Sequence, residues 1–289
     1  MPIVTVCNHK GGCGKTTTTL NLASLMARFL MYLHKQEPTN THPPRILLVD
    51  MDPQAGSNYC LRNKGEAPIK HTLDQLLMVK PSGAVPLLPS VMPSTWEFID
   101  YIPTSEEGMV DANVNMTSRH ANPTKVLDSL LRPLNSTYDF IFVDSGPSRG
   151  SFMWNVLYCG DMIIIPSIME ASNVKGARET ILNIEYLAKV EGRKPYFVGL
   201  LPTVFRKFRK IDDHPLKGSH EEYAQKVETA FKEYGVKMLH PIRESMDSQQ
   251  AYGKKVSIQE HNPKAGVLSD YSDLVEELYN GEKNHRATN

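Results

Sequence analysis

Hydrophobic residues along this chain fall into two kinds of pattern, short continuous runs and longer stretches with helical spacing. Short unbroken runs are typical of parallel strands that are covered on both faces. They lie at residues 3–7, 46–49, 138–143, 161–166 and 196–201. The stretches read as helices lie at residues 18–33, 123–134, 150–159, 176–190, 221–234 and 271–278. This alternation predicts an α/β fold, a doubly wound and mostly parallel sheet flanked by helices, within one domain over residues 1–280.

The remaining segments have weaker patterns. Residues 72–77 predict a short helix, and the proline-rich stretch 81–103 predicts strands and turns. Residues 238–243 are expected to form the last strand. Residues 105–122 are polar with little periodicity, which leaves a loop, a partner surface or an insertion as alternatives. Residues 281–289 are polar, and we expect a disordered tail there.

The most informative segment lies between the first predicted strand and the first predicted helix. It reads Lys10-Gly11-Gly12-Cys13-Gly14-Lys15-Thr16-Thr17. Glycines let successive backbone N–H groups turn inward and form an anion-binding nest, and the helix N-terminus adds its positive end. Residues 11–17 are therefore predicted to bind the phosphates of a nucleotide. Lys15 would reach the β- and γ-phosphates, and the Thr16 hydroxyl would bind Mg²⁺.

Aspartates stand where two of the apolar runs end. Asp50 and Asp52 follow the run at 46–49, and Asp144 follows the run at 138–143. Ligands of open α/β sheets lie at the carboxyl ends of the strands, so these side chains are expected beside the glycine-rich loop. A carboxylate there can hold Mg²⁺ or orient a water molecule for attack on the γ-phosphate. The alternative is that Asp50 and Asp52 only cap the following turn.

The glycine-rich segment resembles the deviant Walker A motif, Lys-Gly-Gly-x-Gly-Lys-Thr-Thr, of the ParA/MinD family of ATPases. The standard phosphate-loop pattern fails here because His9 stands where it has glycine, and Lys10 supplies the extra lysine of the deviant form. Residues 50–54 and 144–148 are similar to the second and third motifs of the family, and the likeness is strongest to the ParA-type partition ATPases. It implies the P-loop NTPase fold and ATP with Mg²⁺ as cofactors.

The resemblance also implies roles for individual residues. Asp52 would position the hydrolytic water, while Thr16, Asp50 and Asp144 would serve the metal. Lys10 would contact phosphates across the interface of a sandwich dimer, so that Lys10, Lys15 and Asp52 form the catalytic set. Further motif features extend this picture. When the closing segment Tyr252-Gly253-Lys254 is matched to the family motif, Pro241 falls on a family proline in a region that packs on the adenine. In the run after Asp144, the family usually has another small residue and a second proline, and here Ser145 and Gly146 replace them.

The family resemblance implies a cellular role as well. Its members form an ATP-dependent homodimer that binds DNA without sequence preference. A ParB-like or other partner protein stimulates hydrolysis, and the cycle positions a plasmid, a chromosome or other cargo. The expected location is cytoplasmic and nucleoid-associated.

The charge balance limits how such a protein could bind DNA. Lys+Arg and Asp+Glu both number 32, so the whole chain is not attracted to nucleic acid and only a local patch could bind it. One dense basic cluster is present at Arg206, Lys207, Arg209 and Lys210. It is predicted either to contact DNA phosphates or to be a solvated loop or a contact to the protein's own acidic face.

Three other functions are weighed against this reading. A MinD-like membrane ATPase would end in a basic amphipathic helix, whereas Asp270, Asp273, Glu276 and Glu277 would be repelled by anionic lipid, so no membrane contact is expected. A reductase like the nitrogenase iron protein needs paired cysteines, and the four cysteines are scattered without a Cys-x-x-Cys. An ATP-binding regulator with little hydrolysis stays open, because it differs from the first reading only in rate. The chain also shows no signal peptide and no apolar segment long enough to span a bilayer.

Overall fold

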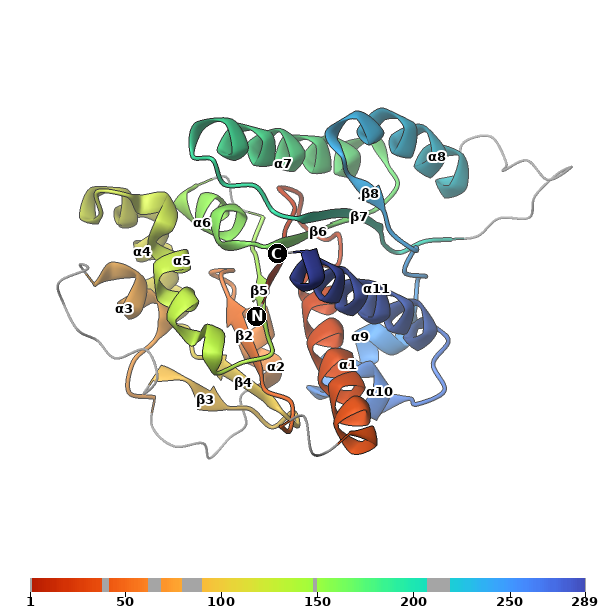
Figure 1. The fold of residues 1–289 in the computed structure, drawn as a ribbon, viewed down its shortest axis with the longest axis horizontal. Coiled ribbons are helices and arrows are strands. Elements are labelled where there is room, and N and C mark those ends of the chain that lie inside the picture. The colour runs from red at the N-terminus through yellow and green to blue at the C-terminus, as the bar shows by residue number, and fades with distance from the viewer. Residues whose placement is uncertain are drawn as a thin grey trace, which may run out of the picture.

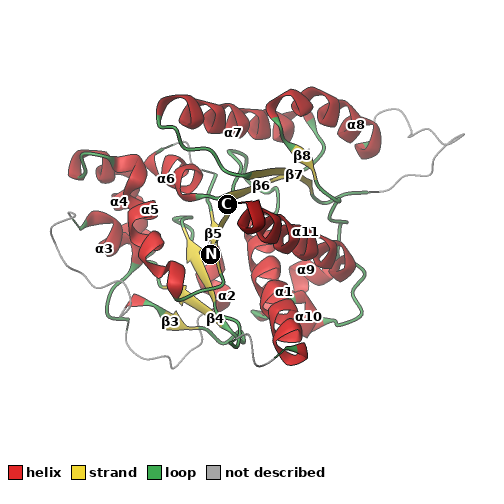
Figure 2. Ribbon diagram, viewed as in Figure 1, coloured by secondary structure: helices red, strands yellow, loops and turns green. Residues whose placement is uncertain are grey.

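The computed structural model describes residues 2–37, 42–61, 69–79, 90–147, 150–206 and 219–288. Within these residues the strands form one sheet in the order β3-β4-β2-β5-β1-β6-β7-β8, with helices on both faces (Figures 1 and 2). All neighbouring strands pair in parallel except β3 and β4. The predicted doubly wound, mostly parallel α/β sheet is therefore confirmed. The strands are β1 (Ile3–Val6), β2 (Ile46–Asp50), β3 (Met92–Pro93), β4 (Ile99–Ile102), β5 (Phe140–Asp144), β6 (Met162–Ser167), β7 (Phe197–Pro202) and β8 (Lys237–Met238).

The helices follow the strands in the expected alternation. They are α1 (Lys15–Gln36), α2 (Gly56–Leu61), α3 (Leu73–Met78), α4 (Glu106–Arg119), α5 (Val126–Leu131), α6 (Ser151–Cys159), α7 (Ala171–Val190), α8 (His220–Phe231), α9 (Met246–Lys254), α10 (Ile258–His261) and α11 (Val267–Thr288). None of the helices in the described ranges is both long enough and apolar enough to cross a bilayer.

Each central strand contributes side chains to two separate cores. On β5, Phe140 and Phe142 pack into the core shared with α1, α2 and α9–α11, whereas Ile141 and Val143 pack into the core shared with α3–α8. Successive side chains of a strand point to opposite faces, so a strand covered on both faces has to be apolar at every position. This explains why the strands appear in the sequence as continuous apolar runs.

The segment at 105–122 is largely a helix, α4, rather than a loop, and the other two alternatives, a partner surface and an insertion, stay predictions. Ser105 caps α4 by accepting a hydrogen bond from the N–H of Gly108 at 3.3 Å. Met109, Ala112 and Met116 are fully buried and lie on one side of the helix. Val110 and Val114 are also apolar but are exposed, so the apolar residues of this stretch do not all fall on the buried side and the helical period is obscured in the sequence.

The carboxyl-terminal segment at 281–289 also differs from the expected disordered tail, because α11 continues to Thr288. Glu282 is buried, and its carboxylate accepts hydrogen bonds from the Tyr196 hydroxyl and from Arg286. The ring of His285 stacks on Tyr196 with 3.8 Å between centroids. These contacts with the start of β7 hold the polar end of the helix against the sheet.

The last strand is shorter than the predicted 238–243. β8 ends at Met238, and Arg243 forms only an isolated bridge with Phe205. Pro241 has no N–H to donate to a neighbouring strand, which favours an early end to the pairing.

A buried carboxylate ties the amino end of the sheet to its helices. Asp161, just before β6, accepts hydrogen bonds from the Ile3 N–H at 2.9 Å, from Arg132 at 2.8 Å and from Arg193 at 2.7 Å. Burial favours the protonated form, but the hydrogen bonds from these three donors hold the pKa of Asp161 below its usual value. The carboxylate is therefore ionised at neutral pH and fully paired.

Replacing Asp161 with asparagine should lower the free energy of unfolding by about 2–4 kcal/mol at pH 7, because two arginines and a strand N–H lose a charged acceptor. Urea denaturation measures this loss. Asp128→Asn removes one partly exposed contact to Arg132 and should cost less than about 1 kcal/mol. Equal losses in the two variants would contradict the assigned importance of Asp161.

Candidate active site

The glycine-rich segment forms a tight loop between β1 and the first turn of α1. Gly12 and Gly14 have φ of 73° and 83°, left-handed conformations that favour glycine. The Cys13 carbonyl accepts a hydrogen bond from the Thr203 hydroxyl at 2.9 Å, which anchors the loop to the end of β7. The side chain of Lys15 is buried, and its ammonium donates to the Lys10 carbonyl at 2.7 Å. The loop therefore has the geometry of an anion nest at a helix N-terminus.

A pocket of ≈ 550 Å³ opens over this loop. Its walls come from the loop itself, the turn after β2, the loop after β5, and α9. The lining residues are Gly11, Gly12, Gly14, Lys15, Thr16, Thr17, Asp52, Gln54, Pro147, Ser248, Gln249 and Tyr252. Most of the predicted nucleotide-binding residues thus line one pocket, whereas the α9 residues were not predicted.

The two strand-end aspartates lie side by side on neighbouring strands and do not themselves line the pocket. Asp50 and Asp144 are register partners on β2 and β5, and both are fully buried. Asp50 accepts from the N–H groups of Asp52 at 3.0 Å and Ser57 at 2.9 Å. Asp144 accepts from the Ser57 hydroxyl at 2.6 Å and the Thr19 hydroxyl at 3.2 Å. Asp50 therefore shapes the turn into α2, while Asp144 joins that turn to α1.

Burial changes the protonation of both carboxylates. Burial raises the pKa of Asp144 to about 6, although hydrogen bonds from Ser57 and Thr16 oppose the rise. Burial and the neighbouring charge of Asp144 raise the pKa of Asp50 well above its usual value. Both ionised forms are thus disfavoured by their surroundings, and a cation beside them would be correspondingly favoured.

The raised pKa of Asp144 predicts a pH dependence of stability in the nucleotide-free and metal-free protein. The pKa of Asp144 in the folded protein lies above its value near 3.9 in the unfolded chain. The contribution of Asp144 to the free energy of unfolding is therefore fully present below about pH 4 and is lost as the pH rises through about 6. Asp144→Asn cannot ionise, so it should gain about 1–3 kcal/mol relative to the wild type between pH 5 and pH 8. Urea denaturation at both pH values measures this gain. The exposed Asp273→Asn should keep the wild-type dependence, and an unchanged slope in Asp144→Asn would contradict the assignment.

Asp52 lies at the wall of the pocket, separate from the buried pair. Its carboxylate accepts a hydrogen bond from the Gln54 N–H at 3.0 Å, and the residue is only half-buried. It is therefore the motif aspartate placed to meet a water molecule in the pocket. Gln54 lines the same pocket, and its side chain is exposed.

Lys10 is exposed at the edge of the loop, and its backbone is braced from β6 and α7. Asn8 donates to the Pro166 carbonyl at 2.7 Å and accepts from the Lys10 N–H at 3.0 Å. A Cβ at Gly176 would lie 2.7 Å from the Asn8 side-chain oxygen and 3.1 Å from the Lys10 Cβ, so only glycine fits there. These bracing residues were not predicted. The only sequence signal was a polar residue, Asn8, directly after a buried strand.

Other predicted site residues lie elsewhere or are not described. Pro241 is half-buried and does not line the pocket, so its contact with adenine stays a prediction. Arg206 is exposed and forms a paired ion contact with Glu244 at 2.6 and 2.7 Å. Lys207, Arg209 and Lys210 fall outside the described residues.

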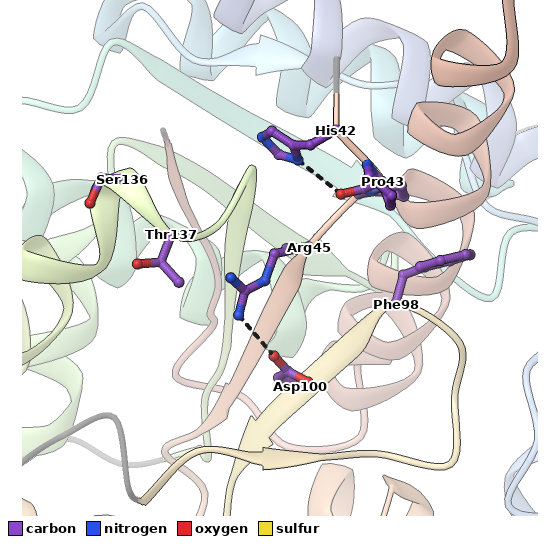
Figure 3. Close-up of a pocket in the computed structure, with 8 residues that line it drawn as sticks. His42, Pro43, Arg45, Phe98, Asp100, Ser136 and Thr137 are labelled. Carbon is purple, nitrogen blue, oxygen red and sulfur yellow. Dashed lines mark hydrogen bonds and ion pairs between the residues drawn. The ribbon is translucent and has the colours of Figure 1, made fainter. Parts of the chain in front are cut away.

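A second pocket, of ≈ 540 Å³, lies at the opposite end of the strands, near the starts of β2, β4 and β5 (Figure 3). Arg45 points toward Asp100 there, at 3.8 Å, and His42 bonds to the Pro43 carbonyl (Figure 3). This pocket contains none of the motif residues.

The donor set at the first pocket fits Mg²⁺ bound together with a nucleotide. Thr16 lines the pocket, and its hydroxyl is close enough to Asp144 to lower the pKa of that carboxyl, so a neutral oxygen and a carboxylate lie near each other beside the loop. Among the described residues, no group of three or more His, Cys, Asp and Glu side chains could hold a metal. Mg²⁺ commonly takes one or two carboxylate contacts and completes its shell with phosphates and water, so this sparse set suits it.

Comparisons with known proteins agree with this geometry. A family model described as an AAA domain matches residues 1–194. The chromosome partitioning protein ParA of Myxococcus xanthus is 25% identical over 276 residues, covering 96% of this chain and 87% of the relative. The sporulation initiation inhibitor protein Soj of Bacillus subtilis is 24% identical over 276 residues, covering 96% of this chain and 97% of the relative. The solved ATP complex of a Cyanothece McdA variant has a TM-score of 0.77 at 20% identity, covers 96% of this chain and 95% of that chain, and supports the fold alone.

Proposed function

Because the chain belongs to the AAA domain family and, within it, to the ParA/MinD P-loop ATPases, we propose that it binds ATP with Mg²⁺ and hydrolyses it within an ATP-dependent sandwich dimer. The dimer would bind DNA without sequence preference, and a ParB-like or other partner protein would stimulate hydrolysis. The cycle would partition or position a plasmid, a chromosome or other cargo at the nucleoid in the cytoplasm.

One observation carries the proposal. The buried Lys15 and the half-buried Asp52 line a single pocket, and the exposed Lys10 stands at the edge of the same loop as Lys15. The buried Asp50, register partner of Asp144, accepts a hydrogen bond from the Asp52 N–H. A fold that only bound an anion would need the loop and the lysine, but not an additional carboxylate at the pocket wall. The combination is the one that phosphoryl transfer to water requires.

The proposed mechanism assigns one task to each side chain. The loop N–H groups and Lys15 hold the β- and γ-phosphates, and Asp52 orients the attacking water. Lys10 of the partner subunit then meets the negative charge that develops on the transferred phosphoryl group, as an arginine finger does. Thr16, Asp50 and Asp144 would hold Mg²⁺, which when bound neutralises phosphate charge.

DNA binding would use the basic cluster that begins at Arg206. Arg206 stands at the start of the basic cluster and is exposed, but Glu244 pairs with its guanidinium. A membrane target is disfavoured because the apolar residues of α11, including Leu274 and Leu278, are already buried in the core shared with α1. An interfacial anchor needs such residues free to enter lipid.

The test uses Asp52→Ala loaded with ATP and Mg²⁺, so that turnover does not empty the dimer. Gel filtration should show a dimer with ATP and a monomer without it. The ATP-loaded variant should shift duplex DNA of unrelated sequences at low salt and release it as salt rises. Failure to bind DNA at low salt would reject the partition reading, and sedimentation with anionic liposomes would favour the membrane-positioning alternative instead.

A further inference from the structure

Gly146 lies two residues after Asp144, in the loop that leads from β5 to α6, and it faces Asp52. A Cβ added at Gly146 would lie 2.8 Å from the Asp52 Oδ1, 2.9 Å from its Cγ and 3.3 Å from its Cα. The first two distances are shorter than real Cβ atoms show. In the arrangement of this chain, the Asp52 carboxylate therefore occupies the space that a Cβ at position 146 would fill.

The obstacle to a side chain at this position is a lack of room beside Asp52 rather than the backbone conformation. Positive φ occurs at Gly12 and Gly14 but not at Gly146, so the backbone there would accept an alanine without strain. The next residue, Pro147, lines the pocket, and its ring lies 3.8 Å from the place where a Cβ on Gly11 would stand. Gly146 thus lies next to the Asp52 turn, and Pro147 lies next to the phosphate loop.

We propose that Gly146 is a positioning residue for Asp52, and this inference rests on the ATPase function proposed above. By lacking a side chain, Gly146 lets the Asp52 carboxylate remain at the pocket wall, with its Oδ1 held by the Gln54 N–H. Gly146 itself touches no reacting atom. Its effect on hydrolysis passes entirely through the position of that carboxylate.

The nature of the clash separates this role from a purely structural one. The two closest atoms are the outer atoms of the Asp52 side chain, which can rotate about χ1, and the Cα at 3.3 Å needs to move only a few tenths of an ångström. The clash that an alanine at position 146 creates is therefore relieved when the Asp52 carboxylate turns away from its place, and the loop does not need to unfold. The phosphate-binding residues 11–17 keep their positions, so ATP affinity should survive.

The test compares Gly146→Ala with the wild type, with Asp52→Ala and with the double variant. Gly146→Ala should lower kcat for ATP hydrolysis by about 10- to 100-fold, because a displacement of about 1 Å of a catalytic group has effects of this size. The Kd for a fluorescent ATP analogue should change less than about twofold. In the Asp52→Ala background Gly146→Ala should have no further effect, because the group it displaces is already gone. Gly281→Ala on α11, where an added Cβ meets only ordinary contacts at 3.4 Å or more, is the control and should keep the wild-type kcat.

Each outcome decides between the claims. A wild type that does not hydrolyse ATP overturns the proposed function and the role of Gly146 with it. A wild type that hydrolyses ATP beside an equally active Gly146→Ala overturns only the role of Gly146. Parallel losses of kcat, ATP affinity and Tm in Gly146→Ala, or an equal further loss in the Asp52→Ala background, would show a structural effect and also overturn it.

Discussion

Replacing Lys15 with alanine is expected to weaken ATP binding by at least about 100-fold. The ammonium is buried beneath the loop and donates to the Lys10 carbonyl at 2.7 Å, so it lies where the phosphates would rest on the loop N–H groups. A buried cation bonded to phosphate oxygens is among the strongest charge-assisted contacts a protein makes, and water cannot replace it there. Titration with a fluorescent ATP analogue measures the loss.

The matched control for this variant is Lys35→Ala on the same helix, α1. Lys35 is exposed in the last turn, more than four turns from the loop. The Lys35→Ala variant loses the same charge as Lys15→Ala, but far from the loop, so its Kd for the ATP analogue should equal the wild-type value. A Lys15→Ala protein that binds ATP as tightly as Lys35→Ala would reject the phosphate-loop assignment.

Lys10→Ala is expected to keep ATP binding within a few fold of the wild type while lowering turnover by about 10²–10³-fold. The hydrogen bonds of Lys10 within its own loop use backbone atoms, because its N–H donates to Asn8 and its carbonyl accepts from Lys15 and Cys13. All three survive the substitution. The exposed ammonium is what the variant loses, and we expect its target in the partner subunit.

Mixing two inactive variants tests whether Lys10 acts on the partner's nucleotide. In a mixed dimer of Lys10→Ala and Asp52→Ala, the site on the Lys10→Ala subunit keeps its own Asp52 and receives the intact Lys10 of the other subunit. Equal amounts should therefore recover roughly a quarter of the wild-type turnover, since half the dimers are mixed and each has one complete site. If Lys10 serves its own subunit, mixing restores nothing.

The central features of the fold and the phosphate loop could be predicted from sequence because they are encoded by neighbouring residues. Val4 and Val6 are buried beside Ile3 and Cys7, and the continuous apolar run predicts this, since a central strand is covered on both faces. Gly12 and Gly14 supply left-handed conformations that few other residues adopt. Local rules of this kind need no knowledge of distant contacts.

The supporting contacts could not be predicted because they depend on tertiary placement. Thr203 meets Cys13 across 190 residues of sequence. Ser57 joins Asp50 to Asp144 only because α2 begins at Gly56, and that short helix has no strong starting signal. A hydroxyl-bearing residue in a loop gives no indication of which distant carbonyl or carboxylate it will meet.

The prediction for residues 145–148 shows how a resemblance can draw attention to the right place for another reason. Gly146 was noted because it replaces the second proline that this family usually has. Its neighbour across the loop, Asp52, was noted for a different role. Only the structure places the two side by side, at 2.8 Å between the Asp52 Oδ1 and a Cβ that glycine lacks.

The strand order has a consequence for how the protein is made. β5 lies between β1 and β2, so the strand that carries the phosphate loop never touches the strand that carries Asp50. A chain emerging from the ribosome has the phosphate loop and Asp50 in its first fifty residues. The strand that joins them, β5, is synthesised only after about ninety further residues. Nascent chains stalled before Phe140 should therefore have no ATP-binding pocket, and the onset of nucleotide capture would report the moment at which β5 inserts.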